Sequence, residues 1–453
     1  MSDNEGTAAA EVDFNDDLFT CANVRFIHFI FPSFSRSVYL FFSIVKIITL
    51  IIIIIITRES LLLSIFYYLT SSSFPLPLPL PLSLSFIVIA QSDVVTKYKI
   101  AADCVNIALE HCITDLIKPG KRITDICVAA DLKLEQECAK YYTKKVDGQK
   151  VEKGSSIPCC ISVNEQVSYN CPDNESKVLL EEGQTVKIDI GAHIDGYVAH
   201  QAVTIIVQGE NAQTQITGKQ ADVIKACIAA QEVAARMLRP GKTTNEISVA
   251  IEKVAKDFGV NLVEGVLSHN MKRFAIDGNK IILLKKTTQE KADDHKIELY
   301  DVFGLDIVMT TGEGKLKQKD EKETQIYKRA LEKTYSLKMK ASRGVFSDVC
   351  FRYPSFPFAA RNLEGGNSAK AGLPECLKHD LLIPYPVLYE KAGEAVAQVK
   401  TTVLVMGKGN DRITKAIEMM QQDVSSEKAL VDEELVELLK QPLKPPAKPR
   451  KKK

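Results

Sequence analysis

Hydrophobic positions along 93–118 recur at three- and four-residue spacings, which places them on one face of an α-helix. Pro119 and Gly120 end this predicted helix, because proline does not continue a helix and glycine favours the turn after one. A second helix is expected through 130–142, with Thr124 or Asp125 as the candidate cap at its start. The apolar positions that define the first helix are Val94, Tyr98, Ala101, Val105, Ala108, Leu109 and Ile113.

One sequence phrase occurs twice, at a constant offset of 121 residues. Residues 116–121, followed by Ile126, match residues 237–242, followed by Ile247. Each copy lies between two helical patterns. The period is too long for a solenoid repeat, so it predicts one pseudo-symmetric domain made of two similar halves.

Strand-like runs lie between and after these helical patterns. Residues 185–190 lead through Gly191 and Gly196 to a second apolar run at 202–207, which predicts a β-hairpin with glycines at its turn. Helices beside antiparallel strands predict an α+β fold. Further strands are expected at 299–309 and 395–405.

The stretch before residue 92 has a different character. Residues 37–56 include fifteen Val, Leu, Ile or Phe, enough apolar length for a membrane-spanning helix. However, residues 71–86 contain only Ser, Phe, Pro and Leu, which pyrimidine codons can all encode, and Gln91 follows, which CAG can encode. A pyrimidine tract before CAG is typical of the end of an intron. We therefore interpret residues 20–91 as a translated intron, with a membrane anchor as the alternative, and exclude them from the fold prediction.

Overall composition bounds the class of protein. The 453 residues include 58 basic and 57 acidic side chains, which excludes a uniformly basic nucleic-acid coat and an acidic disordered chain. This length suits two ordinary domains or one large one. The 11 cysteines form no CxxC pair, so reduced thiols are expected rather than a disulfide framework.

Two segments nevertheless carry dense positive charge. Residues 313–343 hold ten basic and five acidic side chains with two tyrosines interleaved, and residues 440–453 hold seven basic side chains, no acidic ones and four prolines. Basic side chains neutralise phosphates and tyrosines stack on unpaired bases, so both segments are RNA-contact candidates. The alternatives are a solvated helix and loop for the first segment and a nuclear or nucleolar address for the second. The candidate contacts are Lys315, Lys317, Lys328, Arg329, Lys338, Lys340, Lys444, Lys448, Arg450, Lys451, Lys452 and Lys453.

A leucine stripe precedes the basic tail. Leu435, Leu438 and Leu439 form an LxxLL pattern on one face of a predicted helix. Such a face suits insertion into the hydrophobic groove of a regulatory protein. The alternative is that the helix packs on its own domain.

Residue types that bind metals are scattered through the middle of the chain, without an HExxH or CxxC spacing. Asp189 ends one predicted strand and His200 begins the next, so the hairpin brings these two together. Spacing alone does not establish a metal site, because single Asp and His residues near strand ends are usually turn or surface groups. The residues in question are Asp189, His193, Asp195, His200, His269 and Asp306.

Three segments carry a resemblance to a known fold. Residues 185–196 (TVKIDIGAHIDG), 267–270 (LSHN) and 397–404 (AQVKTTVL) resemble the type 2 methionine aminopeptidase, or pita-bread, fold. That fold is α+β, with an antiparallel sheet flanked by helices and two related halves, which agrees with the internal repeat. The resemblance covers residues 93–419.

The resemblance also implies where the family's metal ligands fall. That family holds two divalent metals with two Asp, one His and two Glu. Here the first Asp is Asp189, the second falls on His200, the His is His269, the first Glu falls on Asp306 and the second on Lys400. An ammonium group puts a positive charge where a dimetal centre needs a negative one, so no metal or other cofactor is expected.

The family's two substrate-side histidines fall on Tyr169 and Asp277. With the ligands altered and these histidines gone, the resemblance implies an inactive peptidase.

Other segments resemble one inactive branch of this fold, the ErbB-receptor-binding or proliferation-associated protein family. These are residues 93–99, 326–329, 337–340 and 388–391, together with the LxxLL helix and lysine tail. The resemblance implies a non-enzymatic adaptor in growth control that binds structured RNA, including ribosomal RNA, and associates with ribosomes and pre-ribosomes. It also implies residence in the cytoplasm, nucleus and nucleolus.

The predicted organisation has five parts, and two functions stay open. The first function is this adaptor. The second is a residual metallopeptidase that uses Asp189, His200, His269 and Asp306 with a different metal. Membrane contact is expected only if 20–91 is present in the protein. The parts are a polar acidic leader (1–19), the apolar segment (20–91), an aminopeptidase-like domain (93–419), a C-terminal helix (420–439) and a basic tail (440–453).

Overall fold

The computed structural model describes residues 92–444, apart from 147, 210–214, 287–292 and 420–421. The predicted leader, the apolar segment and most of the basic tail therefore lie outside the described residues. Among the helices of the described part, none is long and apolar enough to cross a membrane.

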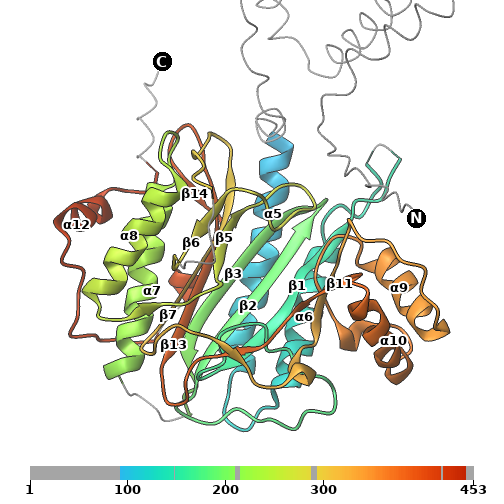
Figure 1. The fold of residues 1–453 in the computed structure, drawn as a ribbon. Coiled ribbons are helices and arrows are strands. Elements are labelled where there is room, and N and C mark those ends of the chain that lie inside the picture. The colour runs from blue at the N-terminus through green and yellow to red at the C-terminus, as the bar shows by residue number, and fades with distance from the viewer. Residues whose placement is uncertain (1–91, 147, 210–214, 287–292, 420–421, 445–453) are drawn as a thin grey trace, which may run out of the picture. The chain divides into compact units, whose positions relative to one another are not determined.

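An antiparallel sheet of nine strands forms the centre of the described chain (Figure 1). Its strands alternate direction throughout, which confirms the predicted α+β class with an antiparallel sheet. In spatial order they are β1 (Lys153–Val163), β2 (Thr185–Ile194), β3 (Tyr197–Ile206), β13 (Val396–Leu404), β7 (Val302–Thr310), β5 (Leu267–Asn270) and β6 (Ile281–Leu283), with β14 (Asp411–Arg412) paired to β13 and β4 (Asn261–Leu262) paired to β7.

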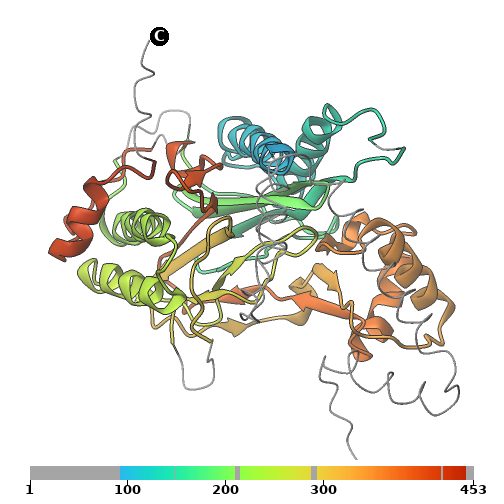
Figure 2. The same ribbon diagram turned by 90° about the horizontal axis from the view of Figure 1, so that it is seen from above.

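Two helix pairs cover the two parts of this sheet (Figure 2). The first pair, α5 (Ser92–His111) and α6 (Ile123–Ala139), packs on β1, β2 and β3. The second pair, α7 (Gly218–Met237) and α8 (Thr244–Asp257), packs on β7, β13 and β6. The sheet and these helices thus form two similar halves, as the internal repeat predicts.

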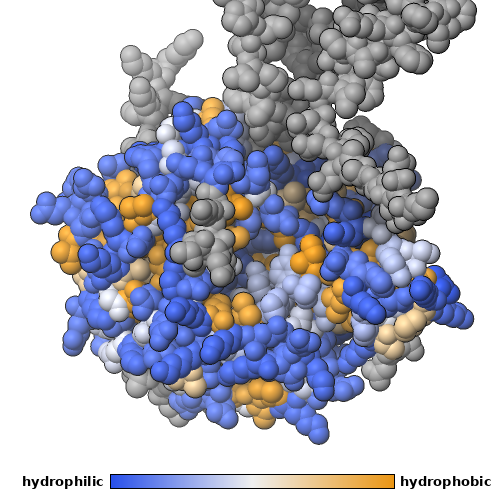
Figure 3. All heavy atoms as spheres, viewed as in Figure 1, coloured by the Kyte–Doolittle hydropathy of each residue, from blue (hydrophilic) through white to orange (hydrophobic). Residues whose placement is uncertain are grey.

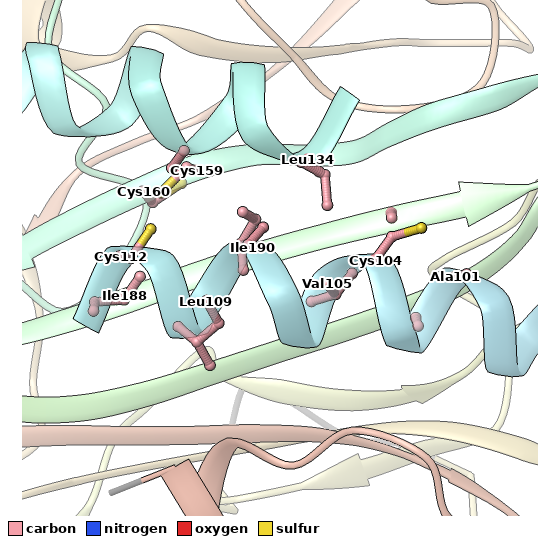
Figure 4. Close-up of a cluster of buried hydrophobic side chains, with 14 of the residues drawn as sticks. Ala101, Cys104, Val105, Leu109, Cys112, Leu134, Cys159, Cys160, Ile188 and Ile190 are labelled. Carbon is pink, nitrogen blue, oxygen red and sulfur yellow. The ribbon is translucent and has the colours of Figure 1, made fainter. Parts of the chain in front are cut away.

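The core of the first half lies between α5, α6 and the sheet (Figure 4). The predicted apolar face of α5 is buried there, and the Cys112 side chain points towards Cys159 of β1. The ten described cysteines are all free thiols, and nine of them are buried. The α-helix ends earlier than predicted. A π-helical turn (Cys112–Leu116) follows it and leads towards Pro119.

Backbone hydrogen bonds repeat between the halves as the sequence does. The amide of Gly120 donates to the carbonyl of Leu180 at 2.7 Å, and that of Gly241 donates to Ile297 at 3.2 Å. Both glycines have a positive φ, 78° and 93°, which other residues adopt only with strain. The helices that follow begin at Ile123 and Thr244, 121 residues apart (244 − 123). The two-fold repeat is therefore structural.

The start of α6 differs from the prediction. Its N-cap residue is Arg122, which makes no capping hydrogen bond, and Thr124 and Asp125 lie inside the first turn. The Thr124 hydroxyl donates instead to the carbonyl of Asp173 at 2.9 Å. The helix begins earlier than expected and ends at Ala139.

The hairpin between β2 and β3 forms as predicted, but only one of its glycines lies at the turn. Asp195 and Gly196 form that turn, with φ of 56° and 79°. Gly191 lies within β2 and pairs with His200. A Cβ atom at Gly191 would approach the His200 ring to 2.1 Å, so glycine there makes room for the imidazole.

A smaller module stands beside the β1 edge of the main sheet (orange in Figure 1). Its apolar cluster joins two helices to a three-stranded sheet, and a two-stranded sheet links the module to the central domain. Its elements are α9 (Lys340–Arg352), α10 (Asn367–Lys378), β9 (Ile326–Arg329), β10 (Phe358–Ala359) and β11 (Leu382–Tyr385), and the linking sheet is β8 (Lys317–Gln318) with β12 (Leu388–Tyr389). Short 3₁₀ turns span Glu321–Glu323 and Ala360–Asn362.

The chain ends its described part with α11 (Ala416–Met419) and α12 (Glu433–Lys440), and α12 packs on α7. On the face shown in Figure 3, hydrophilic residues predominate and apolar ones occur in small groups among them. The most exposed of the large apolar side chains that the structure describes is Phe351 of α9, at 86%.

Candidate functional site

Three of the five positions implied as metal ligands lie in one row across the sheet. In the strand register Asp189 of β2 lies opposite Ala202 of β3, Ala202 opposite Lys400 of β13, and Lys400 opposite Asp306 of β7. Side chains opposite one another point to the same face of a sheet, so both carboxylates and the ammonium group meet on that face.

Lys400 lies between the two carboxylates and forms an ion pair with each. Its Nζ atom contacts Oδ2 of Asp189 and is 2.9 Å from Oδ2 of Asp306. Burial alone lowers the pKa of a lysine, but the attraction of these carboxylates outweighs it and holds the pKa of Lys400 well above its ordinary value. The ammonium is therefore charged, and it occupies the space between the carboxylates that a bridging cation would need.

Gln398 and Ser268 hold Asp306 in place. The side-chain amide of Gln398 donates to Oδ1 of Asp306 at 2.8 Å, and the Ser268 Oγ atom accepts from the Asp306 backbone amide at 2.8 Å. Both carboxylate oxygens of Asp306 are thus engaged. Sequence reasoning missed Gln398, although its place two residues before Lys400 on one strand puts both side chains on the same face.

The two histidines make separate contacts. The Nε2 atom of His200 is 2.9 Å from Oγ of Ser156, and Nδ1 of His269 is 3.1 Å from the carbonyl of Gly278. Burial, reinforced by the charge of Lys400, lowers the pKa of His200 to about 3, so its ring is neutral. No group of three or more His, Cys, Asp or Glu in the described part of the chain is arranged to hold a metal ion.

The other metal-type residues noted in the sequence lie elsewhere. His193 is buried against Phe356, with ring centroids 4.4 Å apart. Asp195 pairs with Lys97 at 3.0 Å and also with Arg273. Both have structural partners of their own, so neither joins the row.

The residues present do not fit a dimetal centre. Oδ1 of Asp189 makes no hydrogen bond among the described residues, which leaves one carboxylate atom for a cation. The charged Lys400 repels a divalent ion from that position, and the other oxygens of the pair are already engaged. We therefore assign no metal chemistry to this row.

A cavity of about 190 Å³ opens beside the row. The predicted substrate-side positions, Tyr169 and Asp277, both line it, as do His200, His269 and Lys400. The Tyr169 ring meets that of Tyr385 edge to face, with centroids 5.1 Å apart. The structure thus brings together the residues that the resemblance implied, although Asp189 lies behind the cavity and is not part of its lining.

The basic candidates divide into exposed and buried residues. Lys315, Lys317, Lys338 and Lys340 are exposed and form no ion pair with other described residues. Lys444 is also exposed, with Nζ 3.7 Å from Oδ2 of Asp411. The remaining tail candidates, Lys448, Arg450, Lys451, Lys452 and Lys453, lie outside the described residues.

Three residues of β9 differ from the prediction of a basic, stacking surface. Lys328 is buried and paired with Asp277, so it does not offer a surface charge to a phosphate. Tyr327 is buried too, and its hydroxyl donates to the carbonyl of Thr324 at 2.7 Å. Arg329 lies partly buried over the ring of Phe346. The cause is that β9 is the middle strand of a small sheet, which the charge pattern did not reveal.

The leucine stripe packs on its own domain. This agrees with the second of the two interpretations of the sequence and not with insertion into the groove of a partner. Leu435 is buried, and Leu438 and Leu439 pack against the apolar cluster of α7 and α8. Asp432 caps α12 by accepting from the amide of Leu435 at 3.1 Å, and it pairs with Lys253 of α8 at 2.9 Å. In this structure the three leucines are not a free surface for a partner.

Comparison with known proteins agrees with this fold. The model of metallopeptidase family M24 matches residues 96–303. ERBB-3 binding protein 1 of Solanum tuberosum is 45% identical over 336 residues, which cover 74% of this chain and 85% of that protein. The chain belongs to the ERBB-3 binding protein 1 family, a branch of the M24 fold.

Two further proteins are similar to this chain over most of their own length. Curved DNA-binding protein of Schizosaccharomyces pombe is 35% identical over 362 residues, covering 79% of this chain and 92% of that one. A solved structure described as a thermophilic Arx1 superposes with a TM-score of 0.72 at 31% identity, covering 78% of this chain and 99% of that chain. Both matches are longer than the M24 match at residues 96–303.

Proposed function

We propose that this chain is a non-enzymatic adaptor that binds structured RNA and associates with ribosomes and pre-ribosomes. It acts in growth and proliferation control from the cytoplasm, nucleus and nucleolus, as its family resemblance implies. The observation that carries the non-enzymatic part is the ion pairing of Lys400 with both Asp189 and Asp306. The ammonium group of Lys400 lies between these carboxylates, where a metal that activates the water of a peptidase would have to bind.

The surface around the small module supports the RNA part of the proposal. Lys338 and Lys340 stand at the start of α9 and are exposed, and their ammonium groups form no ion pair among the described residues, although the backbone amide of Lys338 donates to Glu375 at 2.8 Å. Tyr335 beside them is 38% exposed and stacks on His379, with ring centroids 3.5 Å apart. Unpaired lysines neutralise phosphates and exposed rings stack on unpaired bases. The name of the Schizosaccharomyces pombe relative refers to binding of DNA, another phosphate polymer.

Protein partners are part of the same proposal. The name of the Solanum tuberosum relative refers to binding of a receptor, ERBB-3. The apolar surface of α9, where Phe351 is 86% exposed, is available for protein contact, whereas the LxxLL leucines are packed.

The RNA part is tested by measuring affinity for a structured ribosomal RNA fragment at about 50 and 200 mM salt. We expect affinity to fall steeply with salt, because each lysine–phosphate contact releases a counterion. The double variant K338A/K340A should bind more weakly at both concentrations and reduce the slope of log K against log salt by about 1 to 2.

The matched control is K225A/K256A, which removes two exposed lysines from α7 and α8. It should leave both affinity and slope nearly unchanged. Salt-independent binding, or equal losses in the two double variants, would contradict the proposed RNA surface.

A residual metallopeptidase is the second candidate, and no geometric observation favours it. It would need His200 and His269 to converge on the carboxylates, but each histidine contacts a different group.

A further inference from the structure

Five buried cysteines of the first half lie in contact with one another. They come from the π-helical turn after α5, from α6, from β1 and from the segment that follows β1. Their thiols form a continuous series of contacts, and Figure 4 shows the side chain of Cys112 pointing towards Cys159. In order of contact this cysteine cluster consists of Cys112, Cys159, Cys127, Cys171 and Cys160, all free thiols that are at most 1% exposed.

One member of the cluster, Cys171, lies against a buried positive charge. The guanidinium group of Arg361 contacts the Cys171 sulfur through Nη1 and pairs with Asp131 of α6 through Nη2. The other carboxylate oxygen of Asp131 accepts from the backbone amide of Cys159 at 2.7 Å. Because the Arg361 side chain is only 4% exposed, its guanidinium group is held between the sulfur and the carboxylate.

This environment favours the thiolate form of Cys171. Hydrogen bonds from the thiols of Cys127 and Cys160, together with the charge of Arg361, hold the pKa of Cys171 well below its ordinary value, although burial alone would raise it. The thiolate is the nucleophilic form of cysteine, so Cys171 is the member of the cluster that is prepared to react with an oxidant.

Cys127 is the complementary thiol. It lies one helical turn before Asp131 on α6, so both side chains are on the same face of that helix. Contact with Cys159 and Cys171, together with burial, holds the pKa of Cys127 well above its ordinary value, which keeps this thiol protonated. The other neighbour of Cys171, Cys160, directs its thiol to the carbonyl of Pro158 at 3.2 Å. Cys127 is therefore the favoured partner.

A cavity of about 390 Å³ lies next to Cys171 in the chain. Asn170 and Pro172, on either side of Cys171, both line it, as does Ile123 of α6. The cavity is much larger than the roughly 30 Å³ that a water molecule occupies, so it admits hydrogen peroxide, which is only a little larger than water. A small oxidant can therefore come close to the buried sulfur.

We propose that Cys127 and Cys171 are a modification site at which hydrogen peroxide forms a reversible disulfide bond. The Cys171 thiolate attacks one peroxide oxygen and the O–O bond breaks, which leaves a sulfenic acid on Cys171 and releases hydroxide that takes up a proton to form water. The Cys127 sulfur then attacks the Cys171 sulfur, and the proton of Cys127 leaves with the sulfenic hydroxyl as a second water. Two electrons pass from the two thiols to the peroxide, and a dithiol reductant reverses the reaction. This site goes beyond the adaptor function and does not depend on whether the chain binds RNA.

The test is disulfide mapping of the full chain after treatment with a small excess of hydrogen peroxide at pH 7. The remaining thiols are alkylated under denaturing conditions, and the chain is digested with trypsin and chymotrypsin without reduction. Cleavage after Arg122, Lys133, Tyr169 and Lys177 isolates Cys127 in one peptide and Cys171 in another, apart from the other cysteines. We expect these two peptides to be joined, with a mass lower by two hydrogen atoms, and to separate on addition of dithiothreitol.

Cysteine variants distinguish the roles of the two thiols. In Cys127→Ser, Cys171 should gain oxygen because its sulfenic acid has lost its partner, whereas in Cys171→Ser, Cys127 should remain a free thiol. The matched control is Cys227→Ser, which removes a buried thiol of α7 that donates to the carbonyl of Ala397 at 3.4 Å. It should form the disulfide as the unaltered chain does.

A variant of Arg361 tests the activation of Cys171. Arg361→Gln removes the positive charge, so it should slow disulfide formation at pH 7 about tenfold and shift the midpoint of the rate–pH profile upwards by about one pH unit. If this variant does not fold, the cysteine variants decide the matter alone.

Several results would overturn the proposal. They are the absence of the cross-link at a peroxide dose that oxidises the partly exposed Cys350, a disulfide from Cys171 to Cys160 in place of Cys127, and equal oxidation of Cys127 in Cys171→Ser and its control. A folded Arg361→Gln chain that forms the disulfide at the rate of the unaltered chain would also contradict it. None of these results depends on the RNA experiment, so the two proposals fail separately.

Discussion

At the scale of single residues, Lys400 decides the chemistry of the site. A buried ammonium between two buried carboxylates is stable only because each charge compensates the others, since isolated buried charges are strongly disfavoured. This arrangement makes the centre of the sheet depend on one side chain.

Replacing Lys400 by methionine should therefore destabilise the protein. The substitution keeps the length of the side chain but leaves Asp189 and Asp306 charged, buried and close together. We expect a loss of roughly 3 to 5 kcal/mol in the free energy of unfolding at pH 7, measured by urea denaturation. The loss should shrink at lower pH, where the carboxylates take up protons in place of the missing ammonium.

The control for this variant is Lys256→Met on the exposed face of α8, which should change stability by less than about 0.5 kcal/mol. A Lys400→Met chain as stable as the control would show that the ion pairs contribute little.

Sequence reasoning identified most residues of this row but not all of its contacts. Asp189, His200, His269, Asp306 and Lys400 came from a family resemblance, because their spacing of up to 211 residues carries no local signal (400 − 189). The roles of Gln398 and Ser268 required the strand register, which only the folded sheet provides.

At the scale of elements, the periodicity of apolar residues predicted correctly which face of a helix is buried. It did not predict correctly where the helices begin and end. The apolar face of α5 is buried as predicted, but a π-helical turn takes the place of the last predicted α-helical turn. The start of α6 was missed because Arg122, which the capping rules disfavour, occupies the N-cap. The basic run at Lys328 contains a strand, since local charge density does not reveal burial in a small sheet.

The corresponding position in the second half has a strong cap. Thr243 accepts from the amide of Glu246 at 3.3 Å, and the Glu246 side chain accepts from the amide of Thr243 at 2.8 Å, which forms a capping box at the start of α8. Thr243→Ala should lower the free energy of unfolding by about 1 kcal/mol, since it leaves an amide of the first turn without its acceptor.

Thermal and urea unfolding of Thr243→Ala and Thr243→Ser measure this effect. Serine keeps the hydroxyl and should retain most of the stability. Equal losses in the two variants would mean that the threonine methyl group, and not the cap, stabilises this end of α8.

At the scale of the whole described fold, an M24 scaffold keeps its two-fold architecture, and Lys400 pairs with two carboxylates at the centre of its sheet. The repeat at 121 residues predicted both halves, and the backbone hydrogen bonds of the two loops confirm it. The repeat did not predict the small module. This module lies between β7 and β13 of the second half and has its own apolar cluster. That module presents lysines without ion-pair partners among the described residues, whereas Lys400 in the central row is paired with both Asp189 and Asp306.

We infer that Lys400 has replaced the metals of the M24 centre. The most direct test is elemental analysis of the full chain after equilibration with Mn²⁺, Co²⁺ or Zn²⁺ and removal of unbound metal, beside the variants Asp189→Asn and Asp306→Asn. We expect well under one equivalent of metal in the unaltered chain, and no difference from the variants. One or two equivalents that disappear in both variants would contradict the account, because Lys400 would then have to leave the carboxylates to a metal.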